Sequence, residues 1–267
     1  MLKNITIGQY FPGDTVIHNL DPRVKIISVF LFIMSLFLIK TFYPYILVIV
    51  FIGVTITISK VPISYILKGL KPLMFLIAIT FAINALMTKG EIIFEIGPLD
   101  ITKEGLIQAT FMALRLIFLV IGTSLLTLTT SPISLTDGIE SLLSPFKKIG
   151  VPAHELAMMM TIALRFIPTL LEETDKIMKA QMARGADFES GNIINRAKSL
   201  VPLLVPLFIS AFRRADELAM AMEARCYRGG ENRTRMRKLE LRNRDYIATT
   251  ITVMFSISII ILRFIKL

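Results

Sequence analysis

The stretch "VKIISVFLFIMSLFLI", residues 24–39, decides the fold class, because Lys25 is its only charged residue. An apolar helix of roughly 20 residues can cross the hydrocarbon core of a bilayer. Four further segments are similarly apolar: residues 42–59, 72–88, 106–128 and 247–262. Hydrophobic residues make up 54% of the 267 residues, more than is usual in a soluble domain. The sequence therefore predicts an all-α, polytopic membrane protein with about five transmembrane helices.

The distribution of charge predicts the orientation. Basic residues in short loops mark the cytoplasmic side of a membrane protein. Five basic residues would lie on one side: Arg23, Lys25, Lys60, Lys68 and Lys71. Residues 89–104, between the third and fourth spans, are mostly acidic among their charges. Residues 1–22 lack the apolar core of a cleaved signal peptide, so we expect a cytosolic lead-in. We expect a multi-pass protein of a prokaryotic plasma membrane with a cytoplasmic N-terminus.

Three regions follow from this pattern. Residues 1–128 would hold the lead-in and transmembrane helices 1–4, and residues 247–267 the last transmembrane helix. Residues 129–246 mix apolar and charged residues throughout, which is typical of amphipathic helices. We therefore expect residues 129–246 to form a cytoplasmic or interfacial domain.

Two long amphipathic helices are expected in this middle region. The first would cover about residues 154–184 and kink near Pro168. The second would begin near Asn195. Its most apolar part, residues 200–212, is too short to span a bilayer, so it would lie at the membrane interface or pack on the first helix.

Both helices would end in an arginine, in "AQMARGADFES" at residues 180–190 and "AMEARCYRGG" at residues 221–230. A single arginine followed by glycine is ordinary helix capping, because the cation meets the negative end of the helix dipole and glycine adopts a left-handed conformation. Two copies about forty residues apart favour a functional role. Exposed guanidinium groups beside small alanines could insert into two similar grooves of partner proteins.

No catalytic chemistry is visible in the sequence. It contains no glycine-rich phosphate-binding loop, no defensible pair of catalytic carboxylates and no histidine cluster. Cys226 is the single cysteine, and His18 and His154 are far apart, so neither a disulfide nor a metal site is expected. We expect a protein that is not an enzyme and has no cofactor.

Five segments carry a resemblance to a known family over nearly the whole chain: "LDPRVKII" at 20–27, "ALRLIFLVIGTSLLTLTTSP" at 113–132, "ALRFIPTLLEE" at 163–173, "AQMARGADF" at 180–188 and "LVPLLVPLFISAFRRADELAMAMEARCYRGG" at 200–230. In this order they resemble the transmembrane T component of energy-coupling factor transporters, the EcfT/CbiQ family.

The resemblance implies a non-catalytic coupling subunit of an ABC-type importer for a vitamin or a metal ion. In that family the two arginine-bearing helix ends insert into a pair of ABC-type ATPases, identical or different, and the same helices support a small substrate-binding membrane subunit. The resemblance assigns ATPase docking to six residues: Ala183, Arg184, Gly185, Ala224, Arg225 and Cys226. Cys226 replaces the usual glycine. Because cysteine is disfavoured in the left-handed conformation, we expect the second helix to run one turn further, to Gly229 or Gly230.

Other polar residues have simpler interpretations. Arg115 would lie near the middle of the fourth span, where we expect a hydrogen bond to Asn84 or to a backbone carbonyl to lock the helices together. A role in transport is the alternative. Arg165 could pair with Glu172 or Glu173, or could be solvated. We expect His154 to be a surface residue.

The basic residues 233–244 adjoin a membrane span and lack interleaved aromatic residues. This pattern indicates anionic lipid as a partner and no nucleic acid. Two alternatives to a coupling subunit are a conventional ABC importer permease and a membrane scaffold that only binds anionic lipid.

Overall fold

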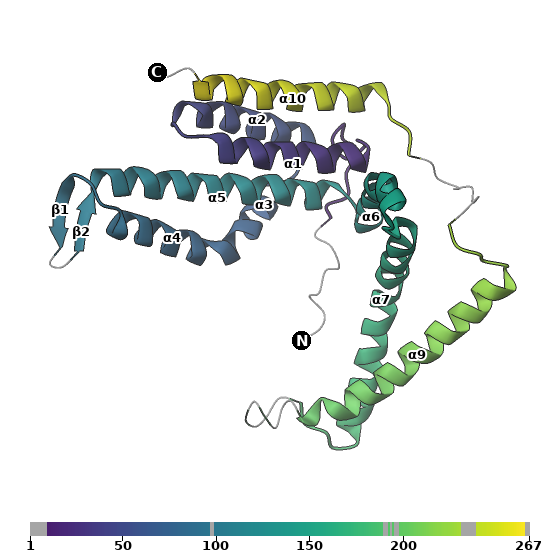
Figure 1. The fold of residues 1–267 in the computed structure, drawn as a ribbon. Helices are drawn as coiled ribbons and strands as arrows, with labels where there is room; N and C mark the ends of the chain where they lie inside the picture. The colour runs from purple at the N-terminus through teal and green to yellow at the C-terminus, as the bar shows by residue number, and fades with distance from the viewer. Residues whose placement is uncertain are drawn as a thin grey trace. The chain divides into compact units, whose positions relative to one another are not determined.

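The computed structural model describes residues 10–96, 99–188, 192, 194, 198–230 and 239–264. Helices dominate these residues, as the all-α prediction required (Figure 1). The helices are α1 (Pro22–Leu38), α2 (Tyr43–Ser59), α3 (Ile63–Leu70), the 3₁₀ turn η2 (Lys71–Leu73), α4 (Met74–Met87), α5 (Lys103–Thr129), α6 (Pro132–Leu143), the 3₁₀ turn η3 (Ser144–Ile149), α7 (Ala153–Ala183), α9 (Val201–Ala224) and α10 (Asn243–Phe264).

A short antiparallel hairpin interrupts the helical pattern between α4 and α5. Its strands are β1 (Ile92–Ile96) and β2 (Leu99–Thr102). The charges of residues 89–104 predict only an external loop between two spans. The signal was present in the sequence, because the β-favouring pairs Ile92-Ile93 and Ile101-Thr102 flank a Gly-Pro dipeptide. The side chain of Thr102 then caps α5 by accepting the N–H of Gly105.

Each of the five apolar segments predicted as spans falls on a helix: α1, α2, α4, α5 and α10. By length and composition, four helical stretches of the described residues can cross a membrane: Ile63–Met87, Lys103–Thr129, Ala153–Ala183 and Asn243–Arg263. Helices α1 and α2, with 17 residues each, are shorter than the usual span. The stretch Ala153–Ala183 has a mean hydropathy of 1.2, against 1.8 to 2.1 for the other three. It is therefore the least apolar of the four.

The contacts within the chain define two compact units, one of residues 8–138 with 238–267 and one that includes residues 139–237. In the first unit, α1 packs against α10 and α5, and α4 lies along α5 (Figure 1). Its core is aromatic and aliphatic and consists of Phe32, Leu36, Ile39, Tyr45, Val48, Ile52, Phe118, Phe255 and Ile259. The rings of Phe51 and Phe255 stack at 4.3 Å between centroids. Apolar burial of this kind joins the first and last helices of the chain.

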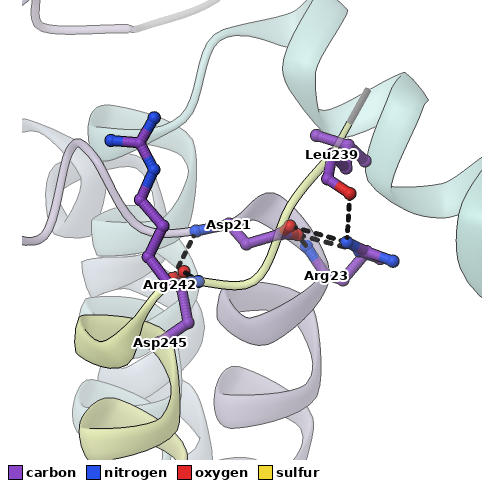
Figure 2. A network of polar contacts seen from close by, with 5 residues as sticks. All are labelled: Asp21, Arg23, Leu239, Arg242 and Asp245. Carbon is purple, nitrogen blue, oxygen red and sulfur yellow. Dashed lines mark hydrogen bonds and ion pairs between the residues drawn. The ribbon is translucent and has the colours of Figure 1, made fainter. Parts of the chain in front are cut away.

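A polar network joins the beginnings of α1 and α10 (Figure 2). The buried carboxylate of Asp245 accepts the backbone N–H of Asp21 at 2.7 Å and that of Arg242 at 2.8 Å. Asp21 caps α1 and binds the guanidinium of Arg23, which also donates to the carbonyl of Leu239. Because their N-termini meet, α1 and α10 run in the same direction.

Helix α5 runs antiparallel to α1 and ends beside its beginning. The buried ammonium group of Lys25 donates to the carbonyl of Thr129 at 2.8 Å and to that of His18 at 3.0 Å. The N–H of Phe11 donates to the carbonyl of Leu128. These donors satisfy carbonyl groups that the end of α5 would otherwise leave unpaired. The end of α5 and the beginning of α10 therefore lie at the same end of this helix bundle.

Candidate functional site

The end of α7 forms a Schellman motif, in which a left-handed residue closes the last turn. The N–H of Ala186 donates to the carbonyl of Gln181 at 2.9 Å, and that of Gly185 donates to the carbonyl of Met182 at 3.0 Å. Arg184 is the last residue before the reversal, and Gly185 has a φ of +90°. This φ lies beyond the range that most side chains accept, so glycine is favoured here.

The end of α9 repeats the motif one residue for one. The N–H of Tyr227 donates to the carbonyl of Met222 at 3.0 Å, and that of Cys226 donates to the carbonyl of Glu223 at 2.8 Å. Arg225 takes the place of Arg184, and Cys226 takes the place of Gly185 with a φ of +55°. The prediction that α9 runs one turn further is wrong.

Cys226 can hold this position because its φ is close to the left-handed helical value of about +57°, which L-residues tolerate at a cost of about 1–2 kcal/mol. The two Schellman bonds offset that cost by satisfying carbonyls of the last turn. All six residues predicted for docking are exposed: Ala183, Arg184, Gly185, Ala224, Arg225 and Cys226. A β-carbon added at Gly185 would meet no atom within 4 Å. The structure therefore presents both arginines on open surface.

Helices α7 and α9 run in opposite directions past each other. Gln181 near the end of α7 donates to the carbonyl of Pro202 near the start of α9. Farther along, the carboxylate of Glu173 accepts the hydroxyl of Ser210 and the guanidinium of Arg214, the latter at 2.6 Å. The two helix ends therefore lie at opposite ends of the pair, about 36 Å apart if the 24 residues of α9 set the distance.

Glu173 pairs with a residue of the neighbouring helix and not with Arg165 of its own helix. Pairing of Glu173 with Arg165 was one possibility, but Glu173 binds Arg214 of α9 instead. Arg165 is exposed, which agrees with the solvated alternative. Helix α7 continues through Pro168, and the predicted start of the second helix at Asn195 lies outside the described residues.

A second polar cluster holds the segment that follows Arg225. His154, at the beginning of α7, contacts Glu140 through Nδ1 at 2.9 Å and lies 3.5 Å from the hydroxyl of Tyr227 through Nε2. A β-carbon at Gly230 would lie 2.3 Å from the His154 ring, so only glycine allows this approach. The His154 side chain keeps 29% of its surface exposed, so it lies at the surface as predicted, but the segment after α9 covers part of its ring.

Arg115 caps a helix from within the bundle. Its guanidinium donates to the carbonyl of Ile39, the residue that ends α1, at 3.2 Å and lies over the ring of Phe37. A cation at this position opposes the negative end of the α1 dipole. The backbone carbonyl is thus the partner, and Asn84 is not: its amide donates to the carbonyl of Thr80 in its own helix.

The family model and the similar proteins found for this chain all point to one family of membrane transport proteins. A family model described as CbiQ, cobalt transport protein, matches residues 13–236. A relative from Thermosediminibacter oceani is 64% identical over 264 residues, covering 99% of this chain and 100% of its own. Relatives from Clostridium kluyveri and Bacillus subtilis are 66% and 53% identical over 251 and 246 residues. They cover 93% and 92% of this chain and 93% of their own lengths. All three relatives are called energy-coupling factor transporter transmembrane protein EcfT.

Proposed function

Because this chain belongs to the EcfT/CbiQ family of energy-coupling factor transporter transmembrane proteins, we propose that it couples two ATPase subunits to a separate substrate-binding membrane subunit. It is a multi-pass transporter component of the membrane. In this proposal the ATPases supply the hydrolysis, and the transmembrane chain transmits their motion. The substrate, a vitamin or a metal ion, is selected by the other membrane subunit.

The observation that carries this proposal is the repeated helix end. Two exposed arginines follow an alanine at matching positions of two Schellman motifs. A guanidinium offers a planar fork of donors that suits carboxylate and carbonyl acceptors in a groove. The C-terminal ends of α7 and α9 have the same structure and lie at opposite ends of the helix pair, so each could bind one of two similar partners. Arg184 would dock one ATPase and Arg225 the other.

A mechanism follows from the crossing of α7 and α9. When two ATPases approach each other on binding ATP, helix ends anchored in them must move together. The pair is joined in the middle by Glu173, Ser210 and Arg214, so the helices would pivot about this link. A pivot changes the surface that the pair presents to another membrane subunit.

An exposed apolar stripe on α9 supports a membrane partner. Val201, Val205, Phe208 and Phe212 recur at helical spacing, and their exposed fractions run from 53% to 69%. Contiguous exposed apolar surface of this kind marks an interaction site. We assign it to the substrate-binding subunit.

The predicted cytoplasmic placement of residues 129–246 has support from the first unit alone. Because α5 ends and α10 begins at the same end of the bundle, the intervening segment leaves and returns on one side. With the N-terminus in the cytoplasm, that side is cytoplasmic, where ATPases and ATP are found. The basic residues up to Arg244 would then face anionic lipid headgroups.

The test is recovery of partners from detergent-solubilised native membrane. We expect the wild-type chain to retain ATPase subunits and a small membrane protein, and the double variant Arg184→Ala, Arg225→Ala to lose the ATPases. Arg213→Ala, which removes an exposed arginine within α9, is the matched control and should retain them. If the double variant recovers as much ATPase as the wild type, both arginines are only helix caps, and a membrane scaffold becomes the better interpretation.

A further inference from the structure

An apolar groove of about 420 Å³ lies in the first unit, among α1, α2, α5 and α10. Its volume is within the range of small-molecule sites, roughly 300–1,000 Å³. Four helices each contribute residues at positions i, i+3, i+4 and i+7, including Phe32 of α1, Val54 of α2, Leu125 of α5 and Ile251 of α10. Seven residues of helix rise about 10 Å, so the groove follows the bundle for about two turns.

One end of the groove is polar. Lys25, Thr129 and Arg244 line it there, at the level where α5 ends and α10 begins. The ammonium group of Lys25 already donates to two carbonyls. Arg244 is different, because its Nε is enclosed and has no acceptor among the described residues. The groove thus combines an apolar body with a guanidinium whose donor lacks a partner.

We propose that this groove binds an anionic phospholipid of the surrounding bilayer, with one acyl chain along the apolar wall and the phosphate on Arg244. When the Arg244 side chain turns Nε toward the groove, one phosphate oxygen would accept from Nε and a second from the adjacent terminal nitrogen, a bidentate geometry that arginine favours. The net charge of +10 further favours an anion over a zwitterion.

The dimensions and exposure agree with a lipid. One leaflet of the hydrocarbon core is about 15 Å thick, so a groove of about 10 Å can hold much of an acyl chain inserted from the headgroup level. Val54, Ile247 and Ile251 line the groove and are 51%, 60% and 53% exposed, so the wall opens toward the surroundings of the bundle. A chain can therefore enter sideways from the membrane.

The test uses the absence of tryptophan from this sequence. Ile251→Trp places a single fluorophore in the groove wall. Val253→Trp places one on the opposite face of the same helix, about 3 Å away in depth. Each chain is reconstituted with tail-brominated phosphatidylglycerol or tail-brominated phosphatidylcholine, which quench tryptophan on contact. Competition by the unbrominated lipids gives the relative affinity at each position.

We expect phosphatidylglycerol to compete about tenfold better than phosphatidylcholine at position 251 and equally well at position 253. Both lipids offer the same phosphate, but only phosphatidylcholine brings a quaternary ammonium cation close to the guanidinium of Arg244. Arg244→Gln should remove the preference, and Arg242→Gln, two residues earlier, should keep it. The proposal is overturned by equal preference at both positions, or by a preference that survives Arg244→Gln. Because neither Arg184 nor Arg225 takes part, loss of ATPase docking in their variants would leave this result unchanged.

Discussion

Gly185 and Cys226 occupy the same position in two matching helix ends, each directly after an exposed arginine and each with a positive φ. The two residues differ in how far they enter the left-handed region, at +90° and +55°. A side chain is strained more at +90° than at +55°. The two ends are therefore alike in hydrogen bonding but unlike in the substitutions that they tolerate.

Substitutions at these two positions should differ in their effect on stability. Gly185→Ala should lower the free energy of unfolding by about 1 kcal/mol, because alanine is strained at this φ. Cys226→Gly should leave stability unchanged or raise it slightly, because glycine relieves strain but is more flexible when unfolded. Thermal unfolding followed by circular dichroism in detergent measures both. Equal losses at the two positions would contradict the assigned helix ends.

The His154 cluster should matter for the second helix end alone. His154→Ala removes the imidazole that links Tyr227 to Glu140, and we expect weaker ATPase binding because the segment after Arg225 loses this contact. In a double-mutant cycle this loss should be present with Arg225 intact and absent in Arg225→Ala. The reason is that His154 is expected to act by positioning Arg225 for its contact with the ATPase. Glu155→Ala, at the adjacent exposed position, is the control. An equal loss in both backgrounds would mean that His154 serves general stability.

Arg115 should contribute to stability and Asn84 should contribute little. Arg115→Ala leaves the carbonyl of Ile39 without its donor and should cost about 1–3 kcal/mol. Asn84→Ala removes only a bond to the preceding turn of its own helix and should cost less than about 0.5 kcal/mol. Arg165→Ala, at an exposed position, is the control for loss of a charge. Unfolding in detergent ranks the three, and a large loss for Asn84→Ala would contradict the pairing.

Stability should fall as pH falls below neutrality, because two groups near the start of α1 hold fewer protons when folded. Burial lowers the pKa of His18, although its bond to the Phe11 carbonyl acts in the opposite direction. Burial alone would raise the pKa of Asp21, but hydrogen bonds from Arg23 and its positive charge outweigh burial and lower that pKa.

For both groups the pKa is higher in the unfolded chain than in the folded chain, so the unfolded chain takes up protons first as pH falls. The stabilisation is therefore complete above the pKa of the unfolded chain and is lost as pH falls through the pKa of the folded chain. The His18 contribution should be lost below about pH 6.5, and the Asp21 contribution below about pH 3.9. Unfolding midpoints at pH 7.5 and 5.5 should differ in the wild type and converge in His18→Gln. A pH dependence that is unaltered in His18→Gln would contradict the first part.

The helical architecture could be predicted because long apolar segments leave few alternatives in a membrane, and the family resemblance is confirmed by the comparisons. The end of α9 could not be predicted, because cysteine is disfavoured in the left-handed conformation and glycines follow at 229 and 230. The chain nevertheless places Cys226 in that conformation, with a φ of +55°. The long-range contacts could not be predicted either: Glu140 and His154, or Glu173 and Arg214, come together only through packing.

Charge counting also has a physical limit in this chain. Lys25 and Arg23 supported the predicted orientation as loop charges. In the structure Lys25 is buried against carbonyl groups, and Arg23 is paired with Asp21. The predicted orientation therefore depends more on Lys60, Lys68 and Lys71 than on Arg23 and Lys25.

Contact between the arginine-bearing helix ends and the ATPases can be measured directly at Cys226. It is the single cysteine of the sequence, it is exposed, and it follows Arg225. We would measure its rate of alkylation by a maleimide, by mass spectrometry of its own peptide, in the isolated chain and in the complex purified with its ATPases. We expect a rate at least about tenfold lower in the complex, because a docked helix end excludes the reagent from the thiol. An unchanged rate in a complex that contains both ATPases would contradict the proposed contact.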